Sequence, residues 1–156
     1  MSYLNALASE EWAIFGGIDP AALSGTSRYS DTVDLTKFRR AVFILMRGSE
    51  AGVIDMAAYQ SAAASAESAS VATDGVAITS YAITQLAAGT TDVQCVLEVG
   101  REALTDGYAF VQVKLTEGGT ASTTCAVIAI GVEPVFWPGA DDDATSVQEI
   151  INLADI

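Results

Sequence analysis

The sequence contains no histidine, which removes the most common general base, metal ligand and proton shuttle of enzyme sites. Its two cysteines, Cys95 and Cys125, stand far apart and do not supply the ligand set of a zinc site. The glycine patterns of nucleotide-binding loops, GxxxxGK[ST] and GxGxxG, are absent as well. We therefore expect a protein that is not an enzyme and that holds no cofactor and no metal ion.

Positive charge is also scarce. The chain has 7 Lys and Arg residues against 20 Asp and Glu residues, and its net charge is −13. Proteins that bind nucleic acids use clustered Lys and Arg to contact phosphates, so we expect no nucleic-acid partner. The longest apolar runs, residues 41–46 and 125–132, fall far short of the roughly 20 residues that cross a bilayer, so we expect no membrane partner either.

Charged residues make up only 17% of the 156 residues, whereas hydrophobic residues make up 51%. This composition is not that of a disordered chain, and the length fits a single domain. A domain with so few charges has to hide much of its surface, either in a large core or against neighbouring subunits.

The apolar residues follow the periodicity of β-strands. In residues 92–99 the odd positions from Val93 to Val99 are expected to face inward, and in residues 108–116 Ala109, Val111, Val113 and Leu115 are expected to do so, with Gln112 facing outward. Residues 40–47 and 124–132 are apolar on both faces and predict two central strands. Weaker strands are predicted over 52–60 and 76–84, and a loop or edge over the Ala- and Ser-rich residues 61–70.

About seven or eight strands separated by turns, with no alternating helices, predict an all-β fold. We expect a two-sheet antiparallel sandwich, jelly-roll-like, with extended or short helical terminal arms. Its domain would cover residues 21–134. Gly16, Gly17 and Pro20 are taken to end the apolar stretch 12–15, so residues 1–20 form an N-terminal arm, and residues 135–156 form a C-terminal arm that is first acidic and then apolar. Cys95 and Cys125 are interpreted as buried free thiols, with a disulfide as the alternative if adjacent strands bring them together.

Apolar and aromatic side chains near the two ends are candidate interface residues. They either close the ends of the sandwich or anchor it to a partner, because aromatic residues dominate interface hot spots. In the acidic C-terminal arm, Asp143 could cap a short helix with Val147, Ile150, Ile151 and Ala154 on one face. The candidate interface residues are Trp12, Phe15, Arg39, Arg40, Phe136, Trp137, Ile150, Ile151 and Leu153.

The two arginines in that set belong to a basic stretch. Five of the seven basic residues lie within residues 28–47, namely Arg28, Lys37, Arg39, Arg40 and Arg47. They form either a cationic patch for an acidic partner or strand-end charges that keep a sheet edge from associating.

Pairs of carboxylates are present, but they give little support to catalysis. Glu98 with Glu102, or Asp31 with Asp34, could act as acid and base in glycoside hydrolysis. With 20 acidic residues such pairs arise by chance, so we interpret them as surface charges. The run Asp141–Asp143 does not have the spacing of an EF-hand loop and is interpreted as a solvated linker rather than a calcium site.

The segment from Tyr29 to Leu45, which runs Tyr-Ser-Asp-Thr-Val-Asp-Leu-Thr-Lys-Phe-Arg-Arg-Ala-Val-Phe-Ile-Leu, resembles the front part of a family of virion proteins. These are the capsid cement, or decoration, proteins of tailed bacteriophages with the HK97-type shell. Residues 96–99, 103–104 and 107–116 are similar to the second half of that family, and residues 126–130 to its closing strand. The resemblance covers roughly residues 12–133 and is a pattern of strands rather than a catalytic motif. The Ala- and Ser-rich residues 61–75 and the acidic tail after Pro134 depart from it.

The resemblance implies a structural virion protein on the outer surface of a phage capsid, made in the host cytoplasm. Its implied partners are the major capsid protein, whose subunit contacts it would stabilise, and a second copy of itself in a homodimer. Two alternatives stay open: a head–tail or tail structural protein with the same sandwich, and an outward-facing carbohydrate- or receptor-binding module.

If the two arms make the attachment, deleting residues 1–15 or 140–156 is expected to leave the fold intact and to weaken binding to the shell. Unchanged occupancy of truncated chains on shells, measured by quantitative gel analysis of purified particles, would contradict this.

Overall fold

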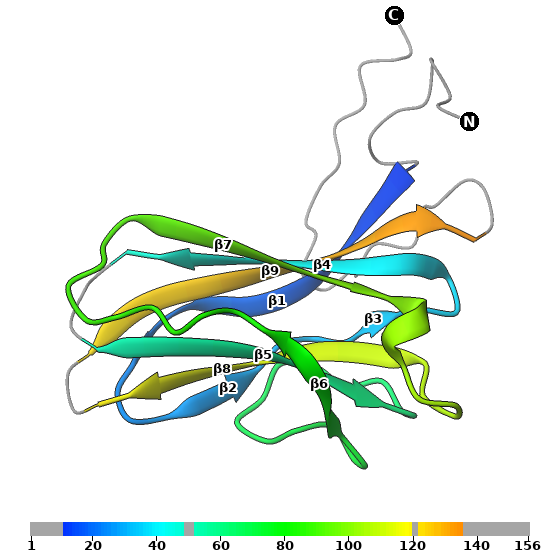
Figure 1. Ribbon diagram of the computed structural model, residues 1–156, viewed down its shortest axis with the longest axis horizontal. Coiled ribbons are helices and arrows are strands. Elements are labelled where there is room, and N and C mark those ends of the chain that lie inside the picture. Colours follow the sequence, from blue (N-terminus) through cyan, green and yellow to red (C-terminus); the bar gives the residue numbers. More distant parts are fainter. Residues whose placement is uncertain (1–10, 49–51, 120–121, 136–156) are drawn as a thin grey trace, which may run out of the picture.

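The fold is a sandwich of two antiparallel β-sheets. The computed structural model describes residues 11–48, 52–119 and 122–135 (Figure 1). The upper layer in Figure 1 has the strand order β1-β9-β4-β7, and the lower layer has the order β2-β8-β5-β6, with β3 also paired to β8. The all-β sandwich predicted from the sequence is confirmed. The strands are β1 (Trp12–Leu23), β2 (Ser27–Tyr29), β3 (Val33–Asp34), β4 (Phe38–Arg47), β5 (Val53–Ser61), β6 (Val76–Ala82), β7 (Val93–Gly100), β8 (Phe110–Gly118) and β9 (Thr123–Pro134), and a 3-10 turn lies at Arg101–Ala103.

The topology is that of a jelly roll, which can be followed as a long antiparallel ribbon. The first half of the chain pairs with the second half in reverse order: β1 with β9, β2 and β3 with β8, β4 with β7, and β5 with β6. Rolling this ribbon brings β4 beside β9 and β5 beside β8, which closes the two sheets. Jelly rolls of this kind occur in viral capsid proteins, lectins and cupins, so the topology alone assigns no function.

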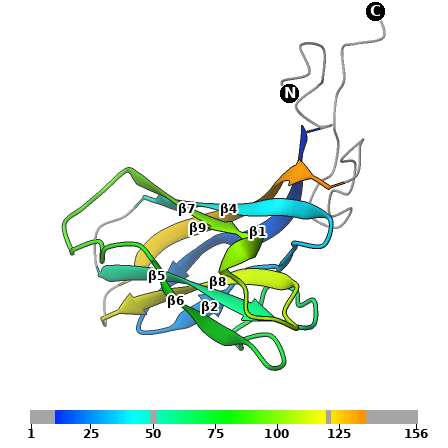
Figure 2. The ribbon, with the colours of Figure 1, turned by 45° about the vertical axis from the view of Figure 1, so that its right-hand side comes forward.

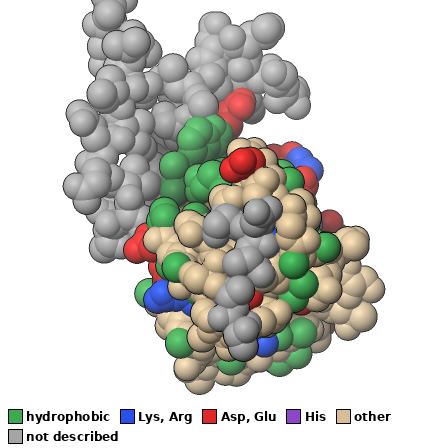
Figure 3. Space-filling model, turned by 90° about the vertical axis from the view of Figure 1, so that its left-hand side faces the viewer, with side chains coloured by type: hydrophobic (Ala, Val, Ile, Leu, Met, Phe, Trp, Pro, Cys, Tyr) green, Lys and Arg blue, Asp and Glu red, His purple; other side chains and the backbone are tan. Residues whose placement is uncertain are grey.

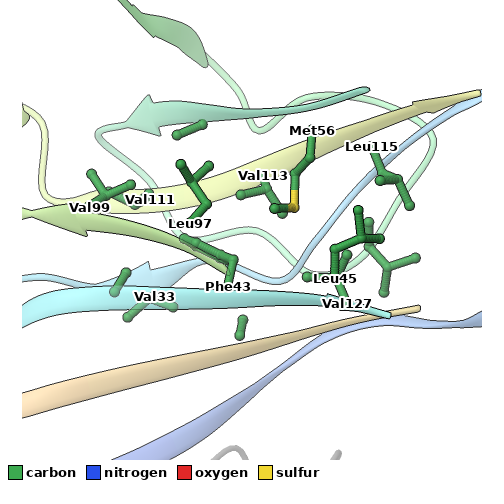
Figure 4. Close-up of a cluster of buried hydrophobic side chains, with 14 of the residues drawn as sticks. Val33, Phe43, Leu45, Met56, Leu97, Val99, Val111, Val113, Leu115 and Val127 are labelled. Atoms are coloured by element: carbon green, nitrogen blue, oxygen red, sulfur yellow. The ribbon is translucent and has the colours of Figure 1, made fainter. Parts of the chain in front are cut away.

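The core lies between the layers and is built from alternate residues of the central strands. In β4, Ala41, Phe43 and Leu45 are fully buried, and the residues between them are not. Figure 4 shows how the two sheets meet there. Its labelled side chains are Phe43, Leu45, Leu97, Val99 and Val127 from the four-stranded sheet, Met56, Val111, Val113 and Leu115 from the opposite sheet, and Val33 from β3.

The predicted boundary of the N-terminal arm at residue 20 falls inside β1, because this strand runs from Trp12 to Leu23 and pairs with β9. Gly16, Gly17 and Pro20, which were expected to end the apolar stretch 12–15, lie inside the strand because its pairing with β9 is irregular. The register shifts between Ile14 and Gly17 and again between Ile18 and Ala21, so Gly16 and Pro20 fall at these breaks. A deletion of residues 1–15 would therefore remove the first four residues of β1, including the buried Ala13.

The alternation predicted for two strands is nearly correct. Leu97 and Val99 of β7 and Val111, Val113 and Leu115 of β8 are buried. Gln112 is the exception: it points away from the core yet is fully buried. The reason is that neighbouring loop residues cover it. The Gln112 side-chain amide, in its hydrogen-bonding orientation, forms hydrogen bonds with the backbone of Ser30 and Ala72. The Ala- and Ser-rich segment is a loop, as predicted, but it also covers part of the five-stranded sheet.

Gly17 shows how tightly β1 packs against β9. Its φ of +149° is one that L-residues rarely adopt, and an added Cβ would lie 1.8 Å from the carbonyl oxygen of Val127. Gly89 also has a positive φ, of +86°, but a Cβ there would meet nothing within 4 Å. A side chain at Gly17 would therefore meet both a backbone clash and conformational strain, whereas one at Gly89 would meet the strain alone.

We expect Gly17→Ala to lower the free energy of unfolding by about 2–4 kcal/mol, because a clash with the β9 backbone adds to the strain of the φ angle. Gly89→Ala, as a control, is expected to lower it by about 1 kcal/mol. Urea denaturation followed by circular dichroism measures both. Equal losses in the two variants would contradict the tight contact between β1 and β9.

Candidate interaction surface

The segment Tyr29–Leu35, which begins the resemblance, holds the outer loop in place. Asp31 accepts hydrogen bonds from the Gly17 amide at 2.8 Å and from the Glu67 amide at 2.9 Å, so one carboxylate ties β1 to the loop 62–75. The backbone amide and the hydroxyl of Thr32 both donate to the Ser65 carbonyl. Val33 and Leu35 point into the core. The motif is thus structural, because each carboxylate oxygen of Asp31 accepts a backbone hydrogen bond.

The outer face of the five-stranded sheet is polar and partly covered. Tyr29 and Tyr59 lie edge to face at an interplanar angle of 84°, with the Lys114 amine 5.9 Å from the centre of the Tyr29 ring. Arg28 of β2 forms an ion pair with Glu67 of the covering loop at 3.2 Å. The perpendicular tyrosine rings do not form the flat aromatic platform that a carbohydrate-binding module needs.

The outer face of the four-stranded sheet is different, because it is mostly apolar, although Arg40, Gln94 and Glu98 also lie on it. We call it the apolar face. We assign residues to this face by two criteria. Along each strand they alternate with buried residues that face the core, and across strands they lie opposite one another in the pairing register. They are Trp12 and Ile14 of β1, Ala126, Ile128, Ile130 and Val132 of β9, Val42, Ile44 and Met46 of β4, and Val96 of β7.

These side chains form continuous cross-strand rows. Ile128, Ile44 and Val96 lie opposite one another in one row, and Ile14, Ile130 and Val42 in the next. No described segment lies over this side of the sandwich in Figures 1 and 2. In the end-on view of Figure 3, hydrophobic side chains gather along the same upper side, with few charged ones between them.

The size of the apolar face is that of a functional patch. Its ten side chains, on strands about 4.8 Å apart and in rows about 6.8 Å apart, give it an area of about 330 Å². Contiguous apolar patches of this size on a monomer often mark an interaction site. The apolar face is therefore the candidate functional site of this chain.

One corner of the apolar face carries a local charge cluster. The Arg40 guanidinium donates to the Glu98 carboxylate at 2.5 Å and also contacts the Glu133 carboxylate. These groups neutralise one another in part, so the apolar face carries little of the strong negative charge of the chain. The neighbouring Arg39 is exposed.

The interpretation of residues 28–47 as one cationic patch is wrong. Arg28 lies on the other sheet, and Arg47 points inward with 2% exposure, since it follows Phe43 and Leu45 in the alternation of β4. Arg47 donates to the carbonyl oxygens of Ala87 at 2.8 Å and Gly52 at 2.5 Å. It therefore links two loops at one end of the sandwich.

Glu117 is a second buried charge at this end, which the sequence pattern did not reveal. It continues the inward series of β8, after Val113 and Leu115, and is 2% exposed. Its carboxylate accepts a hydrogen bond from the Gly25 amide. The Gly52 amide donates to the Thr123 hydroxyl at 2.8 Å, so polar groups fix the loops at this end of the core.

Both cysteines are free thiols, Cys95 half-buried and Cys125 buried. They lie on β7 and β9, and β4 stands between these strands, so they cannot form a disulfide. Burial raises the pKa of the Cys125 thiol to about 11, an effect that Arg47 opposes and Glu117 reinforces. Cys125 is thus an inert core residue.

The candidate interface residues separate into three groups. Trp12 lies on the apolar face, and Arg39 and Arg40 lie at or near its corner. Phe15 instead packs edge to face on Phe38, with ring centres 5.4 Å apart, and so closes one end of the sandwich. Phe136, Trp137, Ile150, Ile151 and Leu153, together with the predicted C-terminal helix, lie outside the described residues.

Two of the carboxylates considered as acid–base candidates, Asp34 and Glu98, have structural partners. Asp34 accepts hydrogen bonds from the Thr36 amide and hydroxyl, and Glu98 is paired with Arg40. Among residues 11–48, 52–119 and 122–135, no group of three or more acidic or cysteine side chains could hold a metal ion. In the same part of the chain, no helix has the length and apolarity to span a membrane.

Comparison with known proteins gives no assignment. No model of a known protein family matches the chain, and a search of curated proteins finds no match.

The raised pKa of Cys125 predicts low reactivity toward thiol reagents. In a Cys95→Ser variant at pH 8, where Cys125 is the only thiol, the thiolate fraction should be about 100-fold below that of a thiol with the ordinary pKa of 9.0. Because the folded state keeps the proton, its stability is expected to fall as the pH rises from about 9 to 11. Labelling with a chromogenic disulfide before and after urea unfolding measures the reactivity of the Cys125 thiol. Fast labelling of the folded chain would contradict the predicted low reactivity.

Proposed function

We propose that this chain is a structural virion protein that binds the outside of a tailed-phage capsid and stabilises contacts between major capsid protein subunits. In this role it acts as a cement protein that needs no reaction, cofactor or metal ion. It is made in the host cytoplasm and ends on the outer surface of the virion.

The observation that carries the proposal is the apolar face. A protein whose task is to hold other folded surfaces together needs a rigid surface whose burial releases water. A face built on four hydrogen-bonded strands meets this need, because its side chains are held by the sheet and lose little freedom on binding. The resemblance of residues 12–133 to cement proteins gives the partner its identity.

The charge distribution supports an outward location. The net charge of −13 opposes contact with packaged DNA, whereas the apolar face carries almost no net charge. The apolar face is therefore the part of the described surface on which a protein partner is least opposed by electrostatic repulsion. Repetition of such contacts over a symmetric shell adds avidity to a modest single interface.

The decisive measurement is the amount of the chain on intact particles. Cement is expected at a copy number close to that of the major capsid protein, or a simple fraction of it, and to be lost on shell disassembly. A copy number on the order of a dozen per particle would instead favour a head–tail or tail protein, since such proteins form rings of limited size.

Substitutions on the apolar face test the contact itself. Ile44→Thr with Ile128→Thr removes two neighbouring isoleucines from the central row, and we expect the affinity for shells to fall about thirtyfold or more through lost apolar burial. Both side chains lie on the outer face, so the fold is expected to persist, as circular dichroism would report. Sedimentation of shells with bound protein measures the affinity.

A matched control changes the opposite sheet. Val53→Thr with Val76→Thr alters two solvent-accessible valines of β5 and β6 and is expected to leave binding unchanged. Deletions of residues 1–10 and of residues 140–156, which leave every described strand whole, test the contribution of the arms. Full binding of the Ile44→Thr, Ile128→Thr variant would refute the role of the apolar face.

A further inference from the structure

The sandwich has four sheet edges, and exposed edges invite pairing with other chains. Natural proteins protect such edges with bulges, prolines, very short strands, lysines or a covering loop. The strand order places β1 and β7 at the edges of one sheet and β2 and β6 at the edges of the other. Each edge can therefore be checked for these devices.

Three of the four edges carry at least one of them. The pairing of β1 has two register shifts, and the strand contains Pro20. β2 is only three residues long, and the covering loop pairs with it at Tyr29 and Ser68. β6 has a register shift in its pairing with β5, and its Ser80 has a φ of +69°.

The β7 edge has none of these devices. All eight of its residues, Val93 to Gly100, pair with β4 without a register shift. It contains no proline and no lysine, and its one charged residue, Glu98, is paired with Arg40 on the sheet. Within the described ranges no strand pairs with its outer side, and Val96 in its centre is 61% exposed.

We propose that β7 pairs antiparallel with β7 of a second copy of this chain, which joins the two four-stranded sheets edge to edge into one continuous sheet. A self-contact is favoured by the sequence of the edge. In the two-fold register centred on Val96, that valine lies opposite its own copy, Glu98 lies opposite Gln94, and Cys95 lies opposite Leu97. No like charges face each other, and apolar residues meet apolar residues.

The neighbouring register is less favourable. Centred on Leu97, it would place the exposed Val96 opposite the charged Glu98 on each side. A register with an odd offset would bring outward-facing residues of one copy beside core-facing residues of the other, which breaks the continuity of both faces. Of these registers, the pairing centred on Val96 is therefore the most favourable.

This dimer also enlarges the candidate interaction surface. The row formed by Ile128, Ile44 and Val96 would continue across the two-fold axis into the same row of the second copy. Two faces of about 330 Å² would then form one surface of about 660 Å². Only this last step rests on the proposed function, because the dimer itself does not require a capsid.

Two valines at sheet edges provide a matched test. Val96→Lys places two lysines opposite each other in the proposed pair, whereas Val76→Lys makes the same change on β6, where the side chain is 46% exposed. We expect the full chain and Val76→Lys to be dimers in sedimentation equilibrium. Val96→Lys is expected to raise the dissociation constant at least about tenfold, through like-charge repulsion at the centre of the pair.

Engineered cysteines test the register independently of any effect of lysine on folding. In a Cys95→Ser background, Val96→Cys places two thiols directly opposite each other and is expected to give a disulfide-linked dimer on mild oxidation. Gln94→Cys is the control, since its two copies would lie about 14 Å apart, beyond the reach of a disulfide. Non-reducing electrophoresis separates the two outcomes.

A monomeric full chain at high micromolar concentration would overturn the inference, and so would a Val96→Lys variant that stays dimeric or a Val76→Lys variant that dissociates. A monomer that loses shell binding only when Val96 is changed would mean that β7 pairs with the shell protein instead. A dimer that does not bind shells would support the β7 pairing and refute the proposed function. A monomer that binds shells would refute the β7 pairing and support the proposed function.

Discussion

The structure depends on the closure of the rolled ribbon by two pairs of strands, β4 with β9 and β5 with β8. These pairs join residues far apart in the sequence, such as Phe43 with Ala129 and Ala58 with Val113. Only when they form does each sheet gain a second central strand and a complete apolar inner face. The core between the layers, and with it the position of every outer side chain, follows from this closure.

The two outer faces of the sandwich differ because, among the residues that the structure describes, a segment covers one of them and none covers the other. Asp31 and Thr32 hold the loop 62–75 against the five-stranded sheet, which explains how Gln112 can be buried while pointing outward. The four-stranded sheet has no such cover within the described residues, although its outward residues are more apolar. An apolar face that no described segment covers, beside a partly covered polar one, is the arrangement expected of a protein that works through contact with other proteins.

Charge is used in two different ways in this chain. Arg47 and Glu117 are buried at one end of the core, where they bind backbone groups of the loops and so satisfy polar atoms that would otherwise lose their water. Arg40 and Glu98 are paired at the corner of the apolar face, which leaves that face nearly neutral on a strongly acidic chain. The first use fixes the loops of the sandwich, and the second reduces the charge on the surface proposed to bind a partner.

The sequence by itself determined the all-β class, most of the strands and the inner faces of β7 and β8, because alternation with a period of two residues is a local property that Leu97, Val99 and Val111 display directly. It also excluded histidine-based chemistry. It did not determine that β1 begins at Trp12, that Arg47 and Glu117 are buried, or that the outward residues of β1, β9, β4 and β7 form one face.

Those facts were decided by the tertiary structure. Bulges allowed Gly16 and Pro20 to sit inside a strand, and the rolling of the ribbon placed side chains from four distant segments in common rows. A local pattern tells which residues alternate, but the neighbours of a strand are set by pairings between distant parts of the chain, and these leave no trace in any single segment.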